Sequence, residues 1–283
     1  MSEELSPIDL IGIELLKRIY QRSVKEGAMT VEVMGPPGSG KTSFCLDMYH
    51  NIVSRKNPYE ICFMRDYIGG AVQFNRVPNW QIFAEDGMDL RFRDILTNDF
   101  FNLPVIYFDS FDDIYYNAKP GYLNAVYFKD ETIGWLDFSK YIRRNMHMSG
   151  NKYLMDSDYS GPVWRSLFWT EYQDLWGANE PNPQWSYNKE MSLEIKNFRR
   201  NYVSCFADTH KRDDVDHRVR GKMMMKGYLR GATVDSHSPI TQRAVNSLDS
   251  FNGKRQILLD WDAHYGKIRF SGYPPKRLFE VIV

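Results

Sequence analysis

The sequence predicts an α/β fold in which a mainly parallel β-sheet lies between helices. Residues 29–34 have strand character and precede a glycine-rich turn and a helical segment. Residues 163–171 form another apolar strand, followed by a loop, a helix over 189–200 and a strand over 202–207, which suits a parallel crossover. Apolar residues make up 43% of the 283-residue chain, which suffices for a substantial core. We expect one domain over residues 1–283.

The remaining elements fit into this domain. Ser6 as N-cap and Pro7 at the first helical position predict an N-terminal helix in residues 1–27 that ends near Gly27. A probable insertion spans residues 87–162, and a β-rich C-terminal extension spans 223–283. Further short apolar segments read as strands, namely 59–64, 80–84, 103–110, 123–128, 223–229, 256–261 and 267–270.

The glycine-rich turn matches a phosphate-binding loop at every fixed position of the pattern G-x-x-x-x-G-K-[ST]. In such a loop, successive backbone N–H groups and the N-terminus of the following helix face the phosphates of a nucleotide. Lys41 is expected to reach the β- and γ-phosphates, and the Thr42 hydroxyl to ligate Mg²⁺. The sequence contains no Asn-Lys-x-Asp motif, which recognises guanine, and this favours ATP over GTP. The predicted nucleotide-binding residues are Gly35, Pro36, Pro37, Gly38, Ser39, Gly40, Lys41, Thr42 and Ser43.

A nucleotide-hydrolysing site also needs a carboxylate that holds Mg²⁺ or activates the attacking water. Two predicted strands end in an acidic residue that could supply it. Asp109 ends a simple apolar strand and is a candidate near the metal. Glu171 ends the strand that leads into the crossover. The strand after Asp109 starts only 14 residues on, across Pro120-Gly121, which suits a hairpin better. We favour Glu171 as the catalytic carboxylate and keep Asp109 as the alternative.

The stretch from Phe206 to Arg220 adds a strand end, Asp208-Thr209-His210, and a charged loop. Together with the phosphate-binding loop and the Glu171 strand, it resembles ATPases of the FtsK/HerA superfamily, the DNA-pumping and packaging motors, and the related Zot-like proteins. The resemblance implies a RecA-like P-loop NTPase core. It also implies that His210 contacts the γ-phosphate or its attacking water, and that Arg218 or Arg220 stabilises transition-state charge across a subunit interface. Thr170 stands where this family has Asp.

The resemblance further implies a function, the coupling of ATP hydrolysis to translocation or packaging of double-stranded DNA. It implies a homo-oligomeric ring, a hexamer in this family, and a portal, capsid or membrane-channel partner. Two alternatives stay open: a RecA- or KaiC-like ATPase that uses Asp109, and a nucleotide-gated scaffold with little hydrolysis, which Thr170 in place of Asp would favour.

Composition limits the other classes of protein. The 36 basic and 36 acidic residues balance, which argues against a protein coated in basic residues. Cys45, Cys62 and Cys205 lie far apart in apolar strings and read as reduced thiols of a cytoplasmic protein. No apolar run approaches the roughly 18 residues that a membrane span needs. We therefore expect a cytoplasmic protein, in the host cytoplasm if it is viral.

Overall fold

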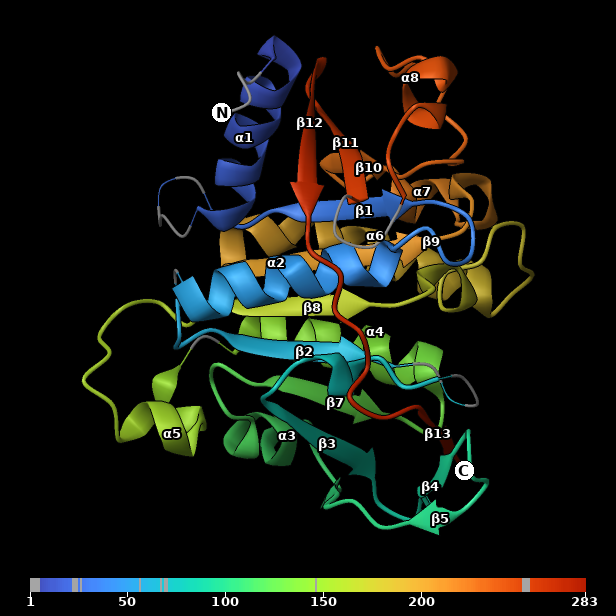
Figure 1. Ribbon diagram of the computed structural model, residues 1–283. Coiled ribbons are helices and arrows are strands. Elements are labelled where there is room, and N and C mark those ends of the chain that lie inside the picture. Colours follow the sequence, from blue (N-terminus) through green and yellow to red (C-terminus); the bar gives the residue numbers. More distant parts are fainter. Residues whose placement is uncertain are drawn as a thin grey trace, which may run out of the picture.

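A sheet of ten strands forms the centre of the molecule, in the order β12-β11-β10-β1-β9-β8-β2-β7-β3-β6 (Figure 1). The structure is a computed structural model that describes residues 6–21, 25, 27–55, 57–66, 68, 71–145, 147–250 and 255–283. Neighbouring strands from β10 to β6 are parallel, whereas β11 and β12 add an antiparallel hairpin. The predicted α/β class is therefore confirmed. The strands are β1 (Thr30–Met34), β2 (Ile61–Arg65), β3 (Trp80–Glu85), β6 (Ile106–Phe108), β7 (Leu123–Tyr127), β8 (Arg165–Trp169), β9 (Val203–Thr209), β10 (Met225–Tyr228), β11 (Arg255–Trp261) and β12 (His264–Phe270).

Helices cover both faces of the sheet, and a separate apolar core fills the space on each face. Strands β1, β2, β7, β8 and β9 are buried along their whole length. A parallel sheet covered on both faces needs apolar side chains on both sides of each strand, so these segments read as nearly continuous apolar runs. The helices are α1 (Pro7–Tyr20), α2 (Lys41–Arg55), α3 (Phe111–Asn117), α4 (Glu131–Arg144), α5 (Lys152–Met155), α6 (Gln184–Phe198), α7 (His217–Arg220) and α8 (Gln242–Asn246).

The N-terminal helix α1 starts as expected, with Ser6 as N-cap and Pro7 in the first turn. It packs along β12, where Gly12 and Gly266 bring the two backbones into close contact. The helix ends at Tyr20, with Gln21 extended, and therefore before the expected end near Gly27. Residues 1–5, 22–24 and 26 lie outside the described residues. No helix in the described part of the chain is long and apolar enough to cross a membrane.

After β12 the chain passes over α2 before it reaches a second, smaller sheet (Figure 1). Tyr273 marks this crossing, because its hydroxyl donates to Asp47 Oδ1 at 3.1 Å and its ring lies against His50 of α2. The small sheet was not predicted, because its strands are short and β13 lies far along the chain from the other two. It is antiparallel and contains β13 (Phe279–Ile282), β4 (Arg91–Asp94) and β5 (Phe100–Phe101).

The predicted hairpin after Asp109 is wrong. Strands β6 and β7 lie on opposite edges of β3, and both run parallel to it. The connection contains α3, whose N-cap Ser110 accepts a hydrogen bond from the Asp113 amide. A helix of two turns is enough for a parallel crossover, which needs only about a dozen residues. Residues 87–162, the predicted insertion, thus supply both β6 and β7 to the main sheet.

Candidate functional site

The phosphate-binding loop connects β1 to α2, and α2 begins at Lys41. Gly38 and Gly40 have φ angles of +75° and +104°, which residues with a side chain rarely adopt. A Cβ at Gly38 would meet no atom within 4 Å, so the backbone angle alone requires glycine there. The loop thus turns sharply into the N-terminus of α2, where free N–H groups gather. This geometry suits an anion.

Strand β9 brings a second set of polar side chains to this loop. It pairs with β1 in parallel register, with Val33 opposite Asp208 and Met34 opposite Thr209. The Gly35 amide donates to the Thr209 carbonyl at 3.3 Å, which continues the ladder into the loop. His210 follows immediately at the carboxyl end of β9. Because carboxyl ends of parallel strands meet at one edge of a sheet, β9 and β1 together form the floor of the site.

His210 joins the two residues predicted to act on the phosphates. Its Nδ1 lies 2.9 Å from Lys41 Nζ, and its Nε2 lies 3.3 Å from Glu171 Oε1. An ammonium group can only donate, so Nδ1 accepts and a neutral imidazole carries its proton on Nε2, towards Glu171. The predicted residues Lys41, His210 and Glu171 are therefore connected by consecutive contacts, with His210 in the middle. The side chains of His210 and Glu171 are 32% and 37% exposed, so solvent and ligands can reach them.

Asp208 supplies a buried carboxylate that the sequence reading missed. Its Oδ2 accepts from the Thr42 hydroxyl at 3.3 Å, and its Oδ1 accepts from the Glu171 amide at 3.1 Å. Burial raises the pKa of Asp208, although the charge of Lys41 and these two hydrogen bonds oppose the increase. Asp208-Thr209-His210 was expected at the end of the strand over 202–207, but Asp208 was assigned no role. In the structure β9 continues to Thr209, which turns Asp208 towards Thr42.

Glu171 is held in a left-handed backbone conformation, with φ 48° and ψ 50°. A residue with a side chain keeps this conformation only when its surroundings support it. Arg65 provides this support from the end of β2, because its Nη1 donates to the carbonyl oxygens of Thr170 and Glu171 at 2.5 and 3.2 Å. Glu131 holds Arg65 in turn, with Oε2 2.5 Å from Nη2. Asp208 and Arg65 thus fix Glu171 at its amide and at its carbonyl.

Thr170, which stands where a carboxylate was expected, makes a structural hydrogen bond. It is 4% exposed, and its hydroxyl donates to the Arg65 carbonyl at 2.9 Å. The hydroxyl therefore links β8 to β2. The carboxylate that contacts Thr42 comes from the neighbouring strand instead, as Asp208. Since Thr170 and Asp208 are 38 positions apart, the sequence pattern around Thr170 cannot reveal this contact.

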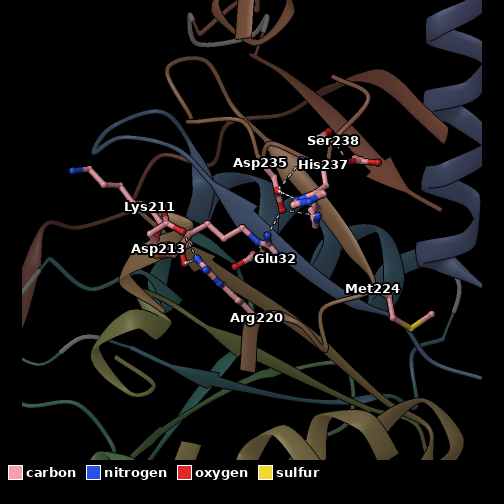
Figure 2. Close-up of polar contacts among 12 residues, drawn as sticks. Glu32, Lys211, Asp213, Arg220, Met224, Asp235, His237 and Ser238 are labelled. Atoms are coloured by element: carbon pink, nitrogen blue, oxygen red, sulfur yellow. Dashed lines mark hydrogen bonds and ion pairs between the residues drawn. The ribbon is translucent and has the colours of Figure 1, made fainter. Parts of the chain in front are cut away.

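A buried ionic network around Glu32 of β1 connects segments that lie next to Glu171 and His210 in the sequence (Figure 2). Glu32, fully buried in β1, accepts a hydrogen bond from Tyr172 and another from Arg212 Nε, the latter at 3.0 Å. Tyr172 follows Glu171, and Arg212 lies two residues after His210. Burial raises the pKa of Glu32, and the positive charge of Arg212 opposes this. One carboxylate therefore anchors the segments that carry Glu171 and His210.

The network continues outward to the loop after β10. Arg212 also pairs with Asp235, which accepts from Lys226 Nζ at 3.1 Å and from the His237 amide at 3.1 Å. Burial favours the neutral form of Asp235, but these donors and the Arg212 charge hold its pKa well below the usual range. Figure 2 shows Asp235 and His237 together at this end of the network. Local sequence patterns do not predict this network, because its members lie far apart in the sequence.

The structure does not bring Asp109 to the phosphate-binding loop. Asp109 is exposed at the end of β6, and six strand spacings separate β6 from β1 in the sheet order. At about 4.8 Å per spacing, this amounts to roughly 29 Å. Asp109 instead lines a separate hollow with Asp112 and Asp130. A metal ion bound at Thr42 is out of its reach within one chain, which corrects the expectation that Asp109 lies near the metal.

Arg218 and Arg220 lie in and beside α7, and each is engaged by a neighbouring acid. Arg218 donates to both oxygens of Asp216, at 2.9 and 2.5 Å, and its guanidinium lies 4.5 Å from the centre of the Trp185 ring. The hydrogen bond from Arg218 is the main reason that the pKa of Asp216 falls to about 2. Arg220 pairs with Asp213 and donates to the Arg212 carbonyl at 2.8 Å. These contacts hold both side chains near the loop that follows His210. The hydrogen bonds and ion pairs that the two arginines form with described residues involve Asp216, Asp213 and Arg212 rather than Lys41 or Glu171.

Comparison with known proteins supports this reading of the fold. No protein-family model matches the chain, and no curated protein matches it in sequence. The genome packaging NTPase B204 from Sulfolobus turreted icosahedral virus 2, in complex with ATP-gammaS, superposes with a TM-score of 0.50 at 11% identity, over 87% of this chain and 98% of B204. The cytoplasmic domain of the Type VII secretion ATPase EccC from Thermomonospora curvata has a TM-score of 0.48 at 11% identity, over 92% of this chain and 28% of that one. The N-terminal domain of zonular occludens toxin from Neisseria meningitidis has a TM-score of 0.34 at 12% identity, over 91% of this chain and 94% of that one.

The match to B204 extends over nearly the whole of both chains. Together with the phosphate-binding loop and the adjoining carboxyl ends of β9 and β8, it shows that this chain shares the α/β P-loop NTPase fold of B204.

Proposed function

We propose that this protein is a Mg²⁺-dependent ATPase. The observation that carries the proposal is the pair of consecutive contacts from Lys41 through His210 to Glu171, at 2.9 and 3.3 Å, beside a phosphate-binding loop. A nucleotide-binding loop alone would not need an exposed carboxylate at this place. Glu171 is held at its amide and its carbonyl, which is the preorganisation that water activation requires. The geometry therefore supports hydrolysis in addition to binding.

The proposed roles follow from these positions. The loop amides and Lys41 hold the β- and γ-phosphates, and Glu171 orients or deprotonates the attacking water. Nδ1 of His210 accepts from Lys41 in the free protein. When Lys41 turns to the phosphates, this nitrogen becomes available, and His210 can report γ-phosphate occupancy to Glu171. The nucleotide thus competes with His210 for Lys41, which links phosphate binding to the position of Glu171.

The residues around Thr42 fit a magnesium ion. The Thr42 hydroxyl and the Asp208 carboxylate offer oxygen atoms, which Mg²⁺ prefers, and burial keeps Asp208 in place. We infer that Thr42 and Asp208 would hold the Mg²⁺ that accompanies the nucleotide, Asp208 through water. The ion would offset the charge of the phosphates. If Asp208 supplies the carboxylate, Thr170 in place of Asp no longer argues against hydrolysis. The hypothesis of a nucleotide-gated scaffold then has no sequence feature that favours it.

We further propose that hydrolysis drives translocation or packaging of double-stranded DNA by a ring of identical subunits. The resemblance of the motifs to the FtsK/HerA superfamily supports this, and B204, which shares the fold, is described as a genome packaging NTPase. In a ring, Arg218 or Arg220 would act on the nucleotide of the neighbouring subunit, once released from Asp216 or Asp213. The alternative that rests on Asp109 is not favoured, because β6 lies at the far edge of the sheet.

The test is ATP hydrolysis by the purified protein, alone and with double- or single-stranded DNA, beside a Lys41→Ala variant. Turnover that requires Lys41 and rises several-fold with double-stranded DNA is the expected result. Turnover that does not respond to DNA would contradict the translocation proposal and leave the ATPase. Nucleotide binding without turnover under all conditions would contradict hydrolysis and favour the scaffold.

A further inference from the structure

An arginine from the C-terminal part of the chain reaches the phosphate-binding loop. Arg255 is the first residue of β11, and its Nη1 donates to the Ser43 hydroxyl at 2.9 Å. Its guanidinium also lies against Gly40. A Cβ built on Gly40 would come within 2.9 Å of Arg255 Nη1 and 3.3 Å of Cζ. Arg255 therefore touches both the last glycine of the loop and the first turn of α2, although it lies more than 200 residues away in sequence.

Arg255 has unused binding capacity in this position. Within the described residues it forms no ion pair with an acid, and its Nε is buried without a hydrogen-bond partner. Ser43 is neutral, so it satisfies one N–H group and leaves the charge unbalanced. A partly buried guanidinium without an anion is unfavourable, because burial removes water that would solvate the charge. Its fork of N–H donors is suited to phosphate oxygens.

A second arginine, Arg76, lies near Arg255. Burial lowers the pKa of Arg76, and the positive charge of Arg255 lowers it further, whereas Asp66 opposes the decrease. The two guanidinium groups are therefore close enough to repel each other. Arg76 donates from Nη1 to the Tyr273 carbonyl at 3.1 Å, and its Nε too is buried without a partner. An anion bound beside Arg255 would relieve this repulsion.

The sheet order indicates which end of a triphosphate Arg255 would meet. His210 and Glu171 follow β9 and β8, on one side of β1, and mark the γ-phosphate end. Arg255 lies on β11, on the other side of β1, and contacts Ser43, one residue beyond Thr42. We propose that Arg255 binds the α-phosphate of the nucleotide held by the phosphate-binding loop. This inference rests on the proposed nucleotide binding, and it does not depend on hydrolysis or on DNA.

Equilibrium binding of ATP and ADP tests it, with wild type compared with Arg255→Ala, Arg255→Gln and Arg255→Lys. Both nucleotides carry the α-phosphate, so Arg255→Ala should weaken both by a similar factor, about 10- to 100-fold. Gln keeps a polar side chain with N–H donors but has no charge, so it should bind as weakly as Ala. Lys restores the charge and should recover part of the affinity. Arg243→Ala, which removes an exposed arginine of α8, is the matched control and should bind like wild type.

Four results would overturn the inference. If Arg255→Gln binds ATP and ADP as tightly as Arg255→Lys, the charge at this position does not contribute to affinity, and Arg255 only stabilises the loop through Ser43. If ATP binding weakens and ADP binding does not, Arg255 acts at the γ-phosphate end. If Arg255→Ala binds both nucleotides like wild type, Arg255 has no part in binding, and the proposed function stands. Absence of nucleotide binding by the wild-type protein would overturn the inference and the proposed function together. Thermal unfolding of each variant identifies any loss of affinity that comes from misfolding.

Discussion

The imidazole of His210 lies between the Lys41 ammonium and the Glu171 carboxylate, 2.9 Å from Nζ and 3.3 Å from Oε1. A neutral histidine in this position accepts from Lys41 and donates to Glu171. It thereby couples the residue that binds phosphate to the residue proposed to activate water. This relationship makes His210 the centre of the site, and it leads to the first prediction.

Replacing His210 by Ala should lower kcat for ATP by about 10- to 100-fold, because a hydrogen bond to a charged group contributes about 1.5–3 kcal/mol. The KM for ATP should change little, since the loop and Lys41 remain. Steady-state kinetics measure both constants. His264→Ala, at the exposed turn of the C-terminal hairpin, is the control. A large increase in KM with kcat unchanged would mean that His210 contributes to binding only.

Substituting the two competing acids separately should distinguish them. Glu171→Gln should reduce turnover by about 10²- to 10⁴-fold, the usual contribution of a general base, and leave nucleotide binding intact. Asp109→Asn should turn over like wild type, because Asp109 lies roughly 29 Å from the loop by strand spacing. Single-turnover hydrolysis and nucleotide titration make the comparison, and Glu180→Gln, on an exposed loop, controls for loss of a surface carboxylate. The reverse result, loss with Asp109→Asn alone, would assign the base to the other strand.

Asp208→Asn should make the free protein more stable and less active. Burial disfavours the ionised Asp208 carboxylate, so a neutral side chain of the same size should raise the free energy of unfolding by about 1 kcal/mol at neutral pH. The same change removes the charge beside Thr42 and should weaken the Mg²⁺ dependence of ATP binding at least tenfold. Urea unfolding without nucleotide and ATP titration at several Mg²⁺ concentrations measure the two effects.

Asp260→Asn is the matched control for Asp208, because Asp260 is also a buried strand carboxylate and bonds to Ser238 at 2.7 Å. It should leave the Mg²⁺ dependence unchanged. An Asp208→Asn protein that binds Mg²⁺ and ATP like wild type would remove Asp208 from the site.

Thr170→Val should cost stability and leave turnover unchanged. The hydroxyl is buried and donates to the Arg65 carbonyl, so its loss should lower the free energy of unfolding by about 1–2 kcal/mol. The side chain makes no contact with Thr42, and Asp208 supplies the carboxylate there. Urea unfolding and steady-state hydrolysis test both parts. A fall in turnover that exceeds the effect on stability would show that Thr170 acts in the reaction.

The α/β class and the phosphate-binding part of the site follow from local sequence patterns. The phosphate-binding loop is a local structure, in which glycines, Lys41 and Thr42 act within eight consecutive residues. It could therefore be recognised from the spacing of these residues in the sequence. The buried strands were readable because burial on both faces of a parallel sheet demands long apolar runs. His210 and Glu171 could be proposed from the resemblance, since each follows one of these strands.

Tertiary structure decided the rest, because it depends on which strands become neighbours. The pairing of β9 with β1 turns Asp208 towards Thr42, and the pairing of β2 with β8 places Arg65 on the backbone of Glu171. The same sheet order removes Asp109 from the site. Arg255 reaches Ser43 only because β11 joins the sheet beyond β10. Such contacts link residues tens to hundreds of positions apart, and no local periodicity or propensity encodes them.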